Sequence, residues 1–364
     1  MGFNCGIVGL PNVGKSTLFN ALTSTAAAES ANYPFCTIEP NIGKIAVPDE
    51  RLQRLAEVAN SKVIIPTQLE FVDIAGIVKG ASKGEGLGNR FLSNIRETDA
   101  ILQVARCFDN EDITHVSGKV DPISDIETIE TELLLADLES VEGRIPGLEK
   151  KAKSGDKSSK EILEVLLQAY EVLKNGEAAI KTKTSPDKRH ILKQLQLITA
   201  KPVMYVCNVS EDDVVSGNRY TEQVINKVGA SNATIISAAI EAEIATLDSE
   251  EEKKEFLGSM GLSSTGLSKV VKQGYDMLGL LTYFTVGPKE ARAWTIESGT
   301  KAPKAAGVIH TDFERGFICA ETTSWRDYID CGGEQGAKQQ GKLRLEGKDY
   351  VVQDGDVMHF RFNV

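Results

Sequence analysis

Short apolar runs alternate with amphipathic stretches over the first 120 residues and again after residue 200. Five runs have the length of a β-strand: Phe3–Gly9, Leu69–Asp73, Ala100–Ala105, Pro202–Val209 and Thr234–Ser237. Segments suited to helices or loops separate them, and Lys15–Ala26 has the character of a helix. Alternation of this kind predicts an α/β fold, with a mainly parallel sheet covered by helices.

A helical period replaces this pattern over residues 125–199. Apolar residues recur at helical spacing in two groups, first Ile126, Ile129, Leu133, Ala136 and Val141, then Ile162, Val165, Leu166, Ala169, Val172 and Leu173. The polar stretch Lys150–Lys160 between them contains Gly155 and is predicted to be a loop. The pattern indicates a helical hairpin, or arm, inserted into the α/β domain.

The character of the chain changes once more after a predicted helix over Ser264–Leu278. The remainder holds many glycines and short alternating strands, at Ala293–Ile296, Phe317–Glu321, Tyr350–Val352 and Val357–Asn363. We therefore predict a discontinuous α/β domain over residues 1–124 and 200–279. The arm occupies residues 125–199, and a small α+β domain occupies residues 280–364.

A glycine-rich loop lies between the first predicted strand and the first predicted helix. Residues 9–16 read Gly-Leu-Pro-Asn-Val-Gly-Lys-Ser and fit G-x-x-x-x-G-K-[ST] at every fixed position. Glycines let backbone N–H groups turn inward around phosphates, and the helix N-terminus adds partial positive charge. Lys15 should reach the β- and γ-phosphates, and the Ser16 hydroxyl should ligate magnesium. The motif predicts a P-loop nucleoside-triphosphatase.

Two further motifs follow in the order expected of a GTPase-like switch domain. Thr37, in Pro-Phe-Cys-Thr, is placed to supply a second hydroxyl to magnesium from a loop. Asp73-Ile74-Ala75-Gly76 closes an apolar strand and matches D-x-x-G. Asp73 would hold magnesium through water, and the Gly76 N–H would sense the γ-phosphate. We therefore expect Gly76 and Lys15 to act in catalysis.

The residues that select the base depart from the usual GTPase pattern. Asn208-Val209-Ser210-Glu211 stands where a GTPase normally has N-K-x-D, whose Asp accepts two hydrogens from guanine. Here Glu211 is one methylene longer, and Val209 replaces the lysine that packs on the base. Sites built on paired hydrogen bonds discriminate steeply, so we expect guanine preference to be lost and adenine accepted. Ser237, after the next strand, resembles the last base-contacting loop.

The position after D-x-x-G holds Ile77, where many relatives place a glutamine that orients water. An apolar side chain cannot orient water, so intrinsic turnover should be slow unless another group serves. The candidates are a monovalent cation such as K⁺ held near Asn12, a residue supplied by a partner, or His115. Histidine is suited to proton transfer near neutral pH, although a lone loop histidine is usually only solvated.

Composition excludes several classes of protein. No apolar run approaches the roughly 20 residues needed to span a bilayer. The N-terminus lacks the basic start and long apolar run of a signal peptide. Six cysteines are scattered without a C-x-x-C pair, which argues against a zinc site or a disulfide framework and fits a reducing cytoplasm.

Charge is distributed unevenly along the 364 residues. The net charge is −11, but residues 142–201 hold 13 Lys/Arg against 8 Asp/Glu, so that this stretch is +5 and the remainder −16. The arm is therefore a candidate surface for an acidic partner such as RNA. A merely solvated Lys-rich helix is the alternative.

Three segments carry a family signature. Gly9–Thr17, Asn32–Asn41 (Asn-Tyr-Pro-Phe-Cys-Thr-Ile-Glu-Pro-Asn) and Asp73–Phe91 strongly resemble the Obg-related GTPases. The variant at Asn208–Glu211, the helical insertion and the C-terminal domain together resemble the YchF branch, the Obg-like ATPases. The resemblance covers essentially the whole chain.

This resemblance implies binding of ATP in preference to GTP, with Mg²⁺. It implies phosphate contacts from Asn12, Val13, Gly14, Lys15, Ser16 and Thr17, magnesium ligands Ser16 and Thr37, and adenine contacts from Asn208, Val209, Glu211 and Ser237. His115 matches a histidine proposed to act in place of the glutamine. Cys36 lies beside the magnesium-binding loop, which suggests redox control, although a buried, inert thiol is the commoner state.

The resemblance also concerns partners. The C-terminal part is similar to a TGS domain, a ubiquitin-like β-grasp module of translation-associated proteins. We expect a cytoplasmic monomer that binds ribosomes, through the large subunit or RNA and not DNA, and acts in translation or stress responses. Two rivals stay open. One is a conventional GTPase switch, and the other is a ribosome- or RNA-binding adaptor that uses nucleotide only as a structural ligand.

Overall fold

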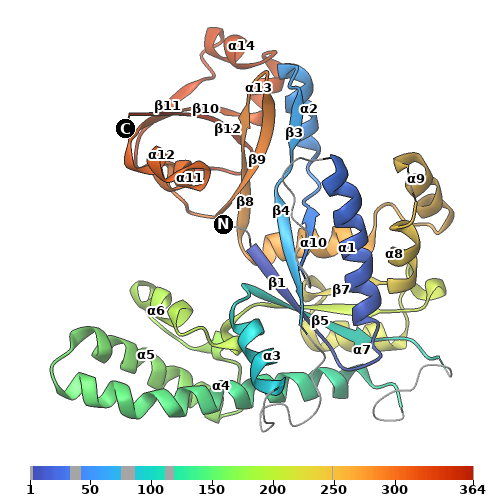
Figure 1. Cartoon of the computed structure of the whole chain (residues 1–364), viewed down its shortest axis with the longest axis vertical. Helices are drawn as coiled ribbons and strands as arrows, with labels where there is room; N and C mark the ends of the chain where they lie inside the picture. Colours follow the sequence, from blue (N-terminus) through green and yellow to red (C-terminus); the bar gives the residue numbers. More distant parts are fainter. Residues whose placement is uncertain (1–2, 33–41, 75–86, 111–118, 248, 364) are drawn as a thin grey trace.

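A computed structural model describes residues 3–32, 42–74, 87–110, 119–247 and 249–363 of the chain. Two six-stranded sheets, connected by helices, form its frame, and a long helical arm extends from the first sheet (Figure 1). No helix in these ranges is both long and apolar enough to cross a membrane.

The first sheet is the predicted α/β domain. Its strands lie in the order β2 (Ile42–Ala46), β4 (Gln68–Asp73), β1 (Phe3–Val8), β5 (Ala100–Arg106), β6 (Val203–Asn208) and β7 (Ala233–Ile236). All neighbours are parallel except β2, which runs antiparallel to β4. Every residue of β5 is buried, as expected for a central strand covered on both faces. The predicted fold class is confirmed.

Helices of the described chain accompany this sheet: three connect its strands, and three follow its last strand in the chain. They are α1 (Lys15–Asn32), α3 (Leu87–Arg96), α7 (Arg219–Val228), α8 (Ala238–Ile244), α9 (Glu250–Ser259) and α10 (Gly266–Met277). Side chains of α1 and α10 join those of β1, β4 and β5 in one apolar core. Because parallel strands all end at the same edge, the loops after β1, β5, β6 and β7 meet there. That edge carries the candidate site.

The arm is a helical hairpin of α4 (Pro122–Lys153) and α5 (Lys157–Lys174), followed by α6 (Arg189–Gln194). Most of the apolar positions that predicted it are buried, among them Ile126, Val141, Val165 and Leu166, each 0% exposed, while Ile162 and Val172 are half-buried. At its base, the buried carboxylate of Asp137 accepts hydrogen bonds from the N–H groups of Ile198 (3.0 Å) and Thr199 (2.7 Å). Single-turn 3-10 helices mark the return path, at Ala179–Lys181, Pro186–Lys188 and Ile198–Ala200.

The tip of the arm is tighter than the sequence predicted. The expected loop over Lys150–Lys160 is wrong in extent, because α4 continues to Lys153 and α5 begins at Lys157. Gly155 has a φ of +94°, which lets the chain reverse within three residues. The side chain of Asp156 caps α5 by accepting from the Ser158 N–H. The left-handed conformation of Gly155 and the helix cap from Asp156 thus replace the long loop that was predicted.

The second sheet belongs to the C-terminal part. Its order is β11 (Arg344–Glu346), β10 (Phe317–Ser324), β12 (Asp356–Phe362), β8 (Leu280–Val286), β9 (Glu290–Glu297) and β3 (Val63–Ile65). The antiparallel pair β8–β9 and the parallel contact of β12 with β8 are consistent with the predicted β-grasp fold. The accompanying helices are α11 (Ala302–Ile309), α12 (Thr311–Arg315), α13 (Trp325–Asp330) and α14 (Glu334–Gln339). The predicted strand Tyr350–Val352 is wrong, because these residues bond to the chain at Thr300–Ala302 and form only an isolated bridge.

One segment joins the two sheets. Between β2 and β4 the chain leaves the first sheet, forms α2 (Glu50–Ala59) and adds β3 to the second sheet, parallel to β9. Leu52, Leu55 and Ala56 of α2 share a core with Phe284 and Tyr328. The predicted division into three units stays a prediction. The structure shows in addition that residues 49–67 pack on the C-terminal sheet.

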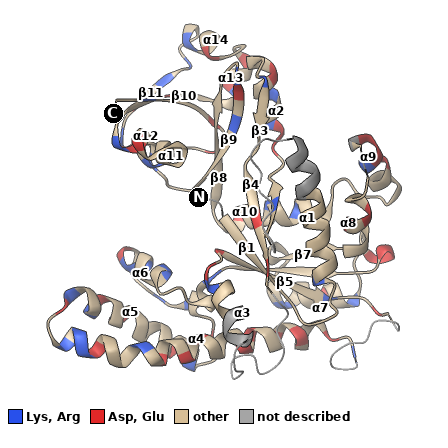
Figure 2. Cartoon of the chain, in the orientation of Figure 1, with Lys and Arg blue, Asp and Glu red and all other residues tan. Residues whose placement is uncertain are grey.

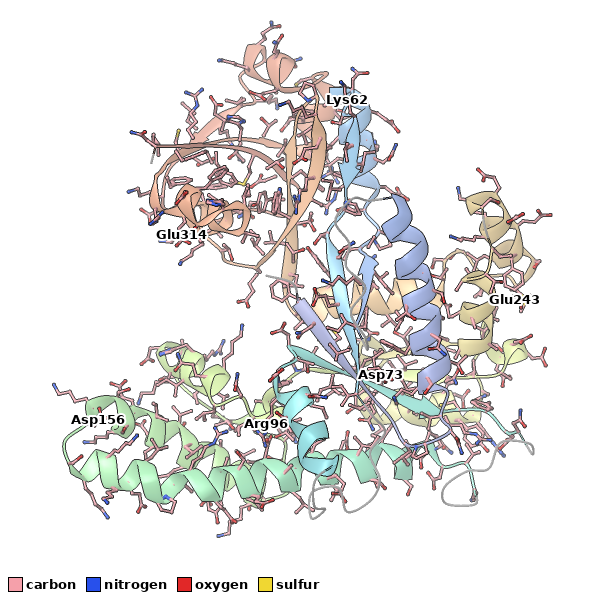
Figure 3. All side chains as sticks on the ribbon, viewed as in Figure 1. Lys62, Asp73, Arg96, Asp156, Glu243 and Glu314 are labelled. Carbon is pink, nitrogen blue, oxygen red and sulfur yellow. The ribbon has the colours of Figure 1, made fainter. Side chains whose placement is uncertain are left out.

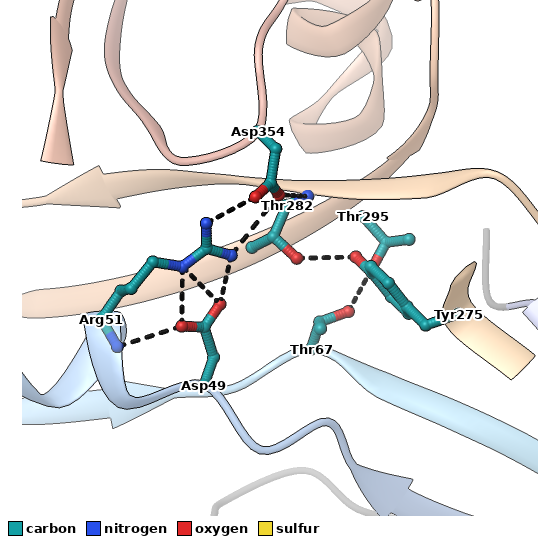
Figure 4. A network of polar contacts seen from close by, with 7 residues as sticks. All are labelled: Asp49, Arg51, Thr67, Tyr275, Thr282, Thr295 and Asp354. Carbon is teal, nitrogen blue, oxygen red and sulfur yellow. Dashed lines mark hydrogen bonds and ion pairs between the residues drawn. The ribbon is translucent and has the colours of Figure 1, made fainter. Parts of the chain in front are cut away.

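A polar network reinforces this junction (Figure 4). The Arg51 guanidinium donates to Asp49 (2.8 Å) and to Asp354 (2.6 Å), and Asp354 accepts from the Thr282 N–H (2.9 Å). Nearby, Thr67 contacts the hydroxyl of Thr295, which also accepts from Tyr275. The C-terminal domain is therefore fastened to the segment between β2 and β4 by both apolar and ionic contacts.

Replacing Leu55 with alanine should destabilise the C-terminal sheet, although Leu55 is distant from it in sequence. Leu55 is 0% exposed, so Leu55→Ala should lower the free energy of unfolding by about 2–5 kcal/mol. Fluorescence of the two tryptophans, Trp294 and Trp325, reports on that sheet during chemical denaturation. The control is Leu345→Ala, at a position 68% exposed, for which we expect a change within about 0.5 kcal/mol. An unmoved tryptophan transition in Leu55→Ala would contradict the shared core.

Candidate functional site

The glycine loop lies between the end of β1 and the start of α1. Asn12 and Gly14 both adopt left-handed backbone conformations, with φ of 64° and 92°. A Cβ atom on Gly14 would lie 2.1 Å from Nδ2 of Asn208, so only glycine fits this position. The Val13 side chain is buried beneath the loop, while Asn12, Ser16 and Thr17 are exposed. The loop thus has its predicted shape, with an open concave side.

Asn208, at the end of β6, holds three loops together. Its Nδ2 donates to the Val13 carbonyl (2.9 Å), and its Oδ1 accepts from the Ala238 N–H (2.9 Å). Its own carbonyl accepts from the Cys107 N–H (2.8 Å). Asn208 is 4% exposed, so these bonds lie away from water. Its side-chain amide thus holds the frame of the site, and its predicted contact with a base stays a prediction.

A cleft of about 1000 Å³ opens at this edge of the first sheet. Its walls are residues 10–17, the loop after β5, residues 208–212 and residues 237–239. Of the predicted nucleotide-binding residues, the cleft is lined by Asn12, Gly14, Lys15, Ser16, Thr17, Asn208, Val209, Glu211 and Ser237. Only Val13 lies behind it. The structure therefore brings together in one hollow the two motifs that lie about 200 residues apart.

Lys15 and Asp73 form an ion pair at the phosphate end of the cleft. Asp73 ends β4, at the centre of the molecule (Figure 3). The two side chains are 10% and 22% exposed, so both stay within reach of a ligand. Ser16 lies in the first turn of α1, where backbone N–H groups lack helical partners. The loop, the lysine and the carboxylate form a cradle for a polyphosphate.

Magnesium fits this donor set. Mg²⁺ prefers oxygen ligands and is commonly held by one or two carboxylates together with substrate phosphates. Asp73 and Ser16 would supply a carboxylate and a hydroxyl. Within the described ranges, no group of three or more His, Cys, Asp or Glu residues could hold a metal ion alone. A metal at this site would therefore depend on the phosphates of a bound nucleotide.

The other end of the cleft is built from β6, β7 and the loop after β5. Val209 is 3% exposed and its N–H donates to the Ile236 carbonyl, while Glu211 is exposed to solvent. Ser237 is 1% exposed, and its hydroxyl has no hydrogen-bond partner among the described residues. A buried hydroxyl without a partner is unusual in a folded protein.

Sequence reasoning missed the wall formed by Phe108, Asp109 and Asn110. No motif marks these residues. The signal that was present is topological, because a loop following β5 must emerge beside those following β1 and β6. Thr37, Gly76, Ile77, His115 and Cys36 lie outside the described residues, so their predicted roles stay predictions.

The buried thiols of the first sheet and of the loop after β5 are poor nucleophiles. Burial, with a contribution from Asp99, raises the pKa of Cys5 to about 12. A hydrogen bond to Cys207 and burial raise the pKa of Cys107 well above its ordinary value. Because the thiolate is the reactive form, these cysteines are inert near neutral pH. They contribute packing to the ends of the strands.

A second cleft, of about 860 Å³, lies at the opposite edge of the first sheet. The base of the arm, the starts of β1 and β6, and Glu297 of the C-terminal domain form its walls. It contains none of the predicted nucleotide-binding residues. The chemistry predicted from sequence belongs to the first cleft.

Comparisons with known proteins agree with this arrangement. A family model described as "50S ribosome-binding GTPase" matches residues 4–137, and a model of the YchF GTPase C-terminal region, described as a protein of unknown function, matches residues 280–363. The chain is 58% identical over 366 residues to "Ribosome-binding ATPase YchF" of Haemophilus ducreyi and 56% identical over 368 residues to that of Bacillus subtilis. Both alignments cover 100% of each chain.

A solved structure shares the whole architecture. The Schizosaccharomyces pombe YchF GTPase superimposes with a TM-score of 0.88 at 41% identity, covering 99% of this chain and 98% of that one. These relatives are named for different nucleotides: the bacterial proteins are called ATPases, and the yeast protein is called a GTPase. Choice of base is therefore the open chemical question at this site.

Asn208→Ala should open the cleft. The Val13 carbonyl and the Ala238 N–H would lose their buried partner, at about 1–3 kcal/mol for each unsatisfied group. We expect a lower melting temperature and at least about tenfold weaker binding of a fluorescent nucleoside triphosphate. Asn20→Ala, at an exposed position of α1, is the matched control and should bind as the wild type does. Full affinity in Asn208→Ala would mean that the glycine loop keeps its shape unaided.

Proposed function

The chain belongs to the YchF family, and on this premise we propose that it hydrolyses ATP to ADP and phosphate, with Mg²⁺, and binds the ribosome according to its nucleotide state. The observation that supports the proposal is a single cleft with a phosphate cradle at one end and an altered base-selecting loop at the other. A cytoplasmic location is part of the same proposal.

At the phosphate end, Asn12 to Thr17 would surround the phosphates with backbone N–H groups. Lys15 pairs with Asp73 in the structure, and a bound triphosphate would compete with the carboxylate for this ammonium group. Mg²⁺, once bound, would neutralise charge on the phosphates. Ser16 and Asp73, together with Thr37, are its proposed ligands, and the Gly76 N–H is proposed to bond the γ-phosphate.

At the base end, we propose that adenine lies against Asn208, Val209 and the Ser237 loop. The Ser237 hydroxyl supports this placement, since a bonded base would satisfy it. Glu211 begins a 3-10 turn and is exposed, so a guanine-specific pair of hydrogen bonds would form in water, where it discriminates weakly. A GTP-specific switch is the alternative.

Competition between nucleotides tests the choice of base. We expect ATP to displace a fluorescent ATP analogue at least about tenfold more effectively than GTP. The reason is that the carboxylate of Glu211 is one methylene longer than that of the aspartate which usually selects guanine. Both titrations use Mg²⁺, with an EDTA control that should weaken both. A clear GTP preference would overturn the ATP assignment, and absence of Mg²⁺-dependent affinity for any nucleoside triphosphate would overturn the proposal itself.

Activation of water is proposed to rest on a group other than residue 77. Ile77 offers no hydrogen bond, so the candidates stay His115, K⁺ held near Asn12, or a residue from the ribosome. We favour His115, which follows the loop after β5 that forms one wall of the cleft. The pocket-lining residues nearest to it in sequence are Asp109 and Asn110.

Docking on the ribosome is proposed to use the arm and the C-terminal domain. Lys and Arg residues are frequent at the free end of the arm (Figure 2). Lys150, Lys151, Lys153 and Lys157 are exposed there, and no ion pair among the described residues uses them. Such a cluster suits the phosphate backbone of ribosomal RNA, with the large subunit as the proposed site. The C-terminal module is proposed to be of the TGS class, and the protein to act as a monomer.

Charge reversal at the arm tip should weaken ribosome binding and its dependence on salt. Replacing the four lysines with glutamate should reduce the slope of log K against log salt by about 3, since each lost phosphate contact removes about 0.7–0.9. The control reverses four exposed lysines of the α/β domain, outside the arm and the C-terminal domain: Lys227, Lys254, Lys269 and Lys272. ATP affinity should be unchanged in both variants. Equal weakening in the control would mean that net charge, and not the arm tip, governs docking.

A further inference from the structure

A fully buried arginine lies under the base end of the cleft. Arg106 is the last residue of β5, is 1% exposed and is among the largest fully buried side chains of the described chain. Desolvating a guanidinium group is costly, so a buried arginine needs compensating polar contacts. Sequence reasoning gave this residue no role, because it belongs to no motif.

The compensating contacts come from the loop that follows Arg106. Its Nε donates to the Phe108 carbonyl (3.2 Å), and its Nη2 donates to the Asn110 carbonyl (3.1 Å). The guanidinium carbon lies 4.7 Å from the centre of the Phe108 ring. The planar group thus orients two carbonyls and one aromatic ring together, which a flexible ammonium group cannot do.

Other contacts hold the same loop from outside. The Asp109 carboxylate accepts from the Tyr220 hydroxyl (2.9 Å) and pairs with Arg219 (3.3 Å). The Cys107 carbonyl accepts from Asn218 (2.8 Å). Of these outer contacts, the pair of Arg219 with Asp109 is exposed and screened by water, whereas Arg106 is 1% exposed and its contacts are sheltered. Arg106 is therefore the dominant constraint on where Phe108 and Asn110 lie.

Phe108, Asp109 and Asn110 form the wall of the cleft opposite residues 208–212. In the parallel ladder, Arg106 is the register partner of Asn208. Two adjacent strands thus end in buried polar residues. Asn208 fixes the glycine loop and the Ser237 loop, and Arg106 fixes the remaining wall.

We propose that Arg106 is a positioning residue for the nucleoside end of the site: it sets the wall formed by Phe108 and Asn110, and thereby the affinity for the nucleoside, without touching the nucleotide. The proposal rests on the proposed function, since it assumes that a nucleoside triphosphate occupies the cleft. It concerns the nucleoside end, because the groups that Arg106 binds belong to Phe108 and Asn110 in the loop after β5.

The test compares two ligands in one protein. ATP uses both ends of the cleft, and inorganic triphosphate uses only the phosphate end. Arg106→Lys keeps the charge but loses the planar fork, so affinity for Mg²⁺-ATP should fall by about tenfold or more, while affinity for Mg²⁺-triphosphate stays within about twofold. Arg292→Lys is the matched control, because Arg292 also lies over an aromatic ring, Trp294, but in the C-terminal sheet. It should change neither affinity.

A second variant tests the proposal independently in case Arg106→Lys does not fold. Arg106→Met has a similar length and removes the buried charge together with its desolvation cost, at the expense of two hydrogen bonds to carbonyls. It should show the same selective loss of ATP affinity. Equal loss of ATP and triphosphate affinity, or no loss of either, would overturn the positioning role. If neither variant folds, Arg106 serves only stability and the proposal fails. Absence of ATP and GTP binding in the wild type would instead refute the proposed function.

Discussion

The side chain of Asn208 is the constraint on which the site depends. Its two hydrogen bonds connect the glycine loop to the loop after β7, and Gly14 approaches it so closely that no side chain fits between them. Both bonds are buried, so breaking either would leave a polar group without a partner. The phosphate end and the base end of the cleft therefore share one rigid centre. A ligand that binds one end meets walls already arranged for the other.

The segment between β2 and β4 gives this site a direct physical connection to the C-terminal domain. β4 ends at Asp73, in the phosphate cradle, and begins next to Thr67, in the junction with the second sheet. One strand of six residues thus spans the distance from Asp73, the proposed magnesium ligand, to the domain junction. Because α2 and β3 are part of the second sheet and its core, the C-terminal domain is not a tethered module. Its position is tied to the strand that carries Asp73.

Local motifs and periodicity predicted most of the site and much of the fold. The glycine loop, Asp73 and residues 208–211 were identified because their chemistry requires fixed residues at fixed spacing. The arm was identified because residues such as Ile126 and Val165 repeat with a helical period over many turns. The excursion of residues 49–67 was not foreseen, since a three-residue strand has no readable period and α2 does not encode which surface its apolar face meets. Phe108 and Arg106 were missed for a similar reason, because their role arises from strand register and not from local sequence.

The buried polar residues at the ends of β5 and β6 are better explained by the loops that they hold in place than by a contribution to stability. An apolar side chain of similar size at residue 106 or 208 would avoid the desolvation of a guanidinium or an amide, but it would leave the loop backbone groups that these side chains bind without a partner. The polar residues instead supply directed hydrogen bonds to loop backbones, which apolar packing cannot provide. Arg106 and Asn208 are paired in register on adjacent strands. Their side chains therefore form these hydrogen bonds at the same level of the sheet, immediately below the cleft. Two polar residues, each the last of its strand, thus fix the loops along the binding edge of the parallel sheet.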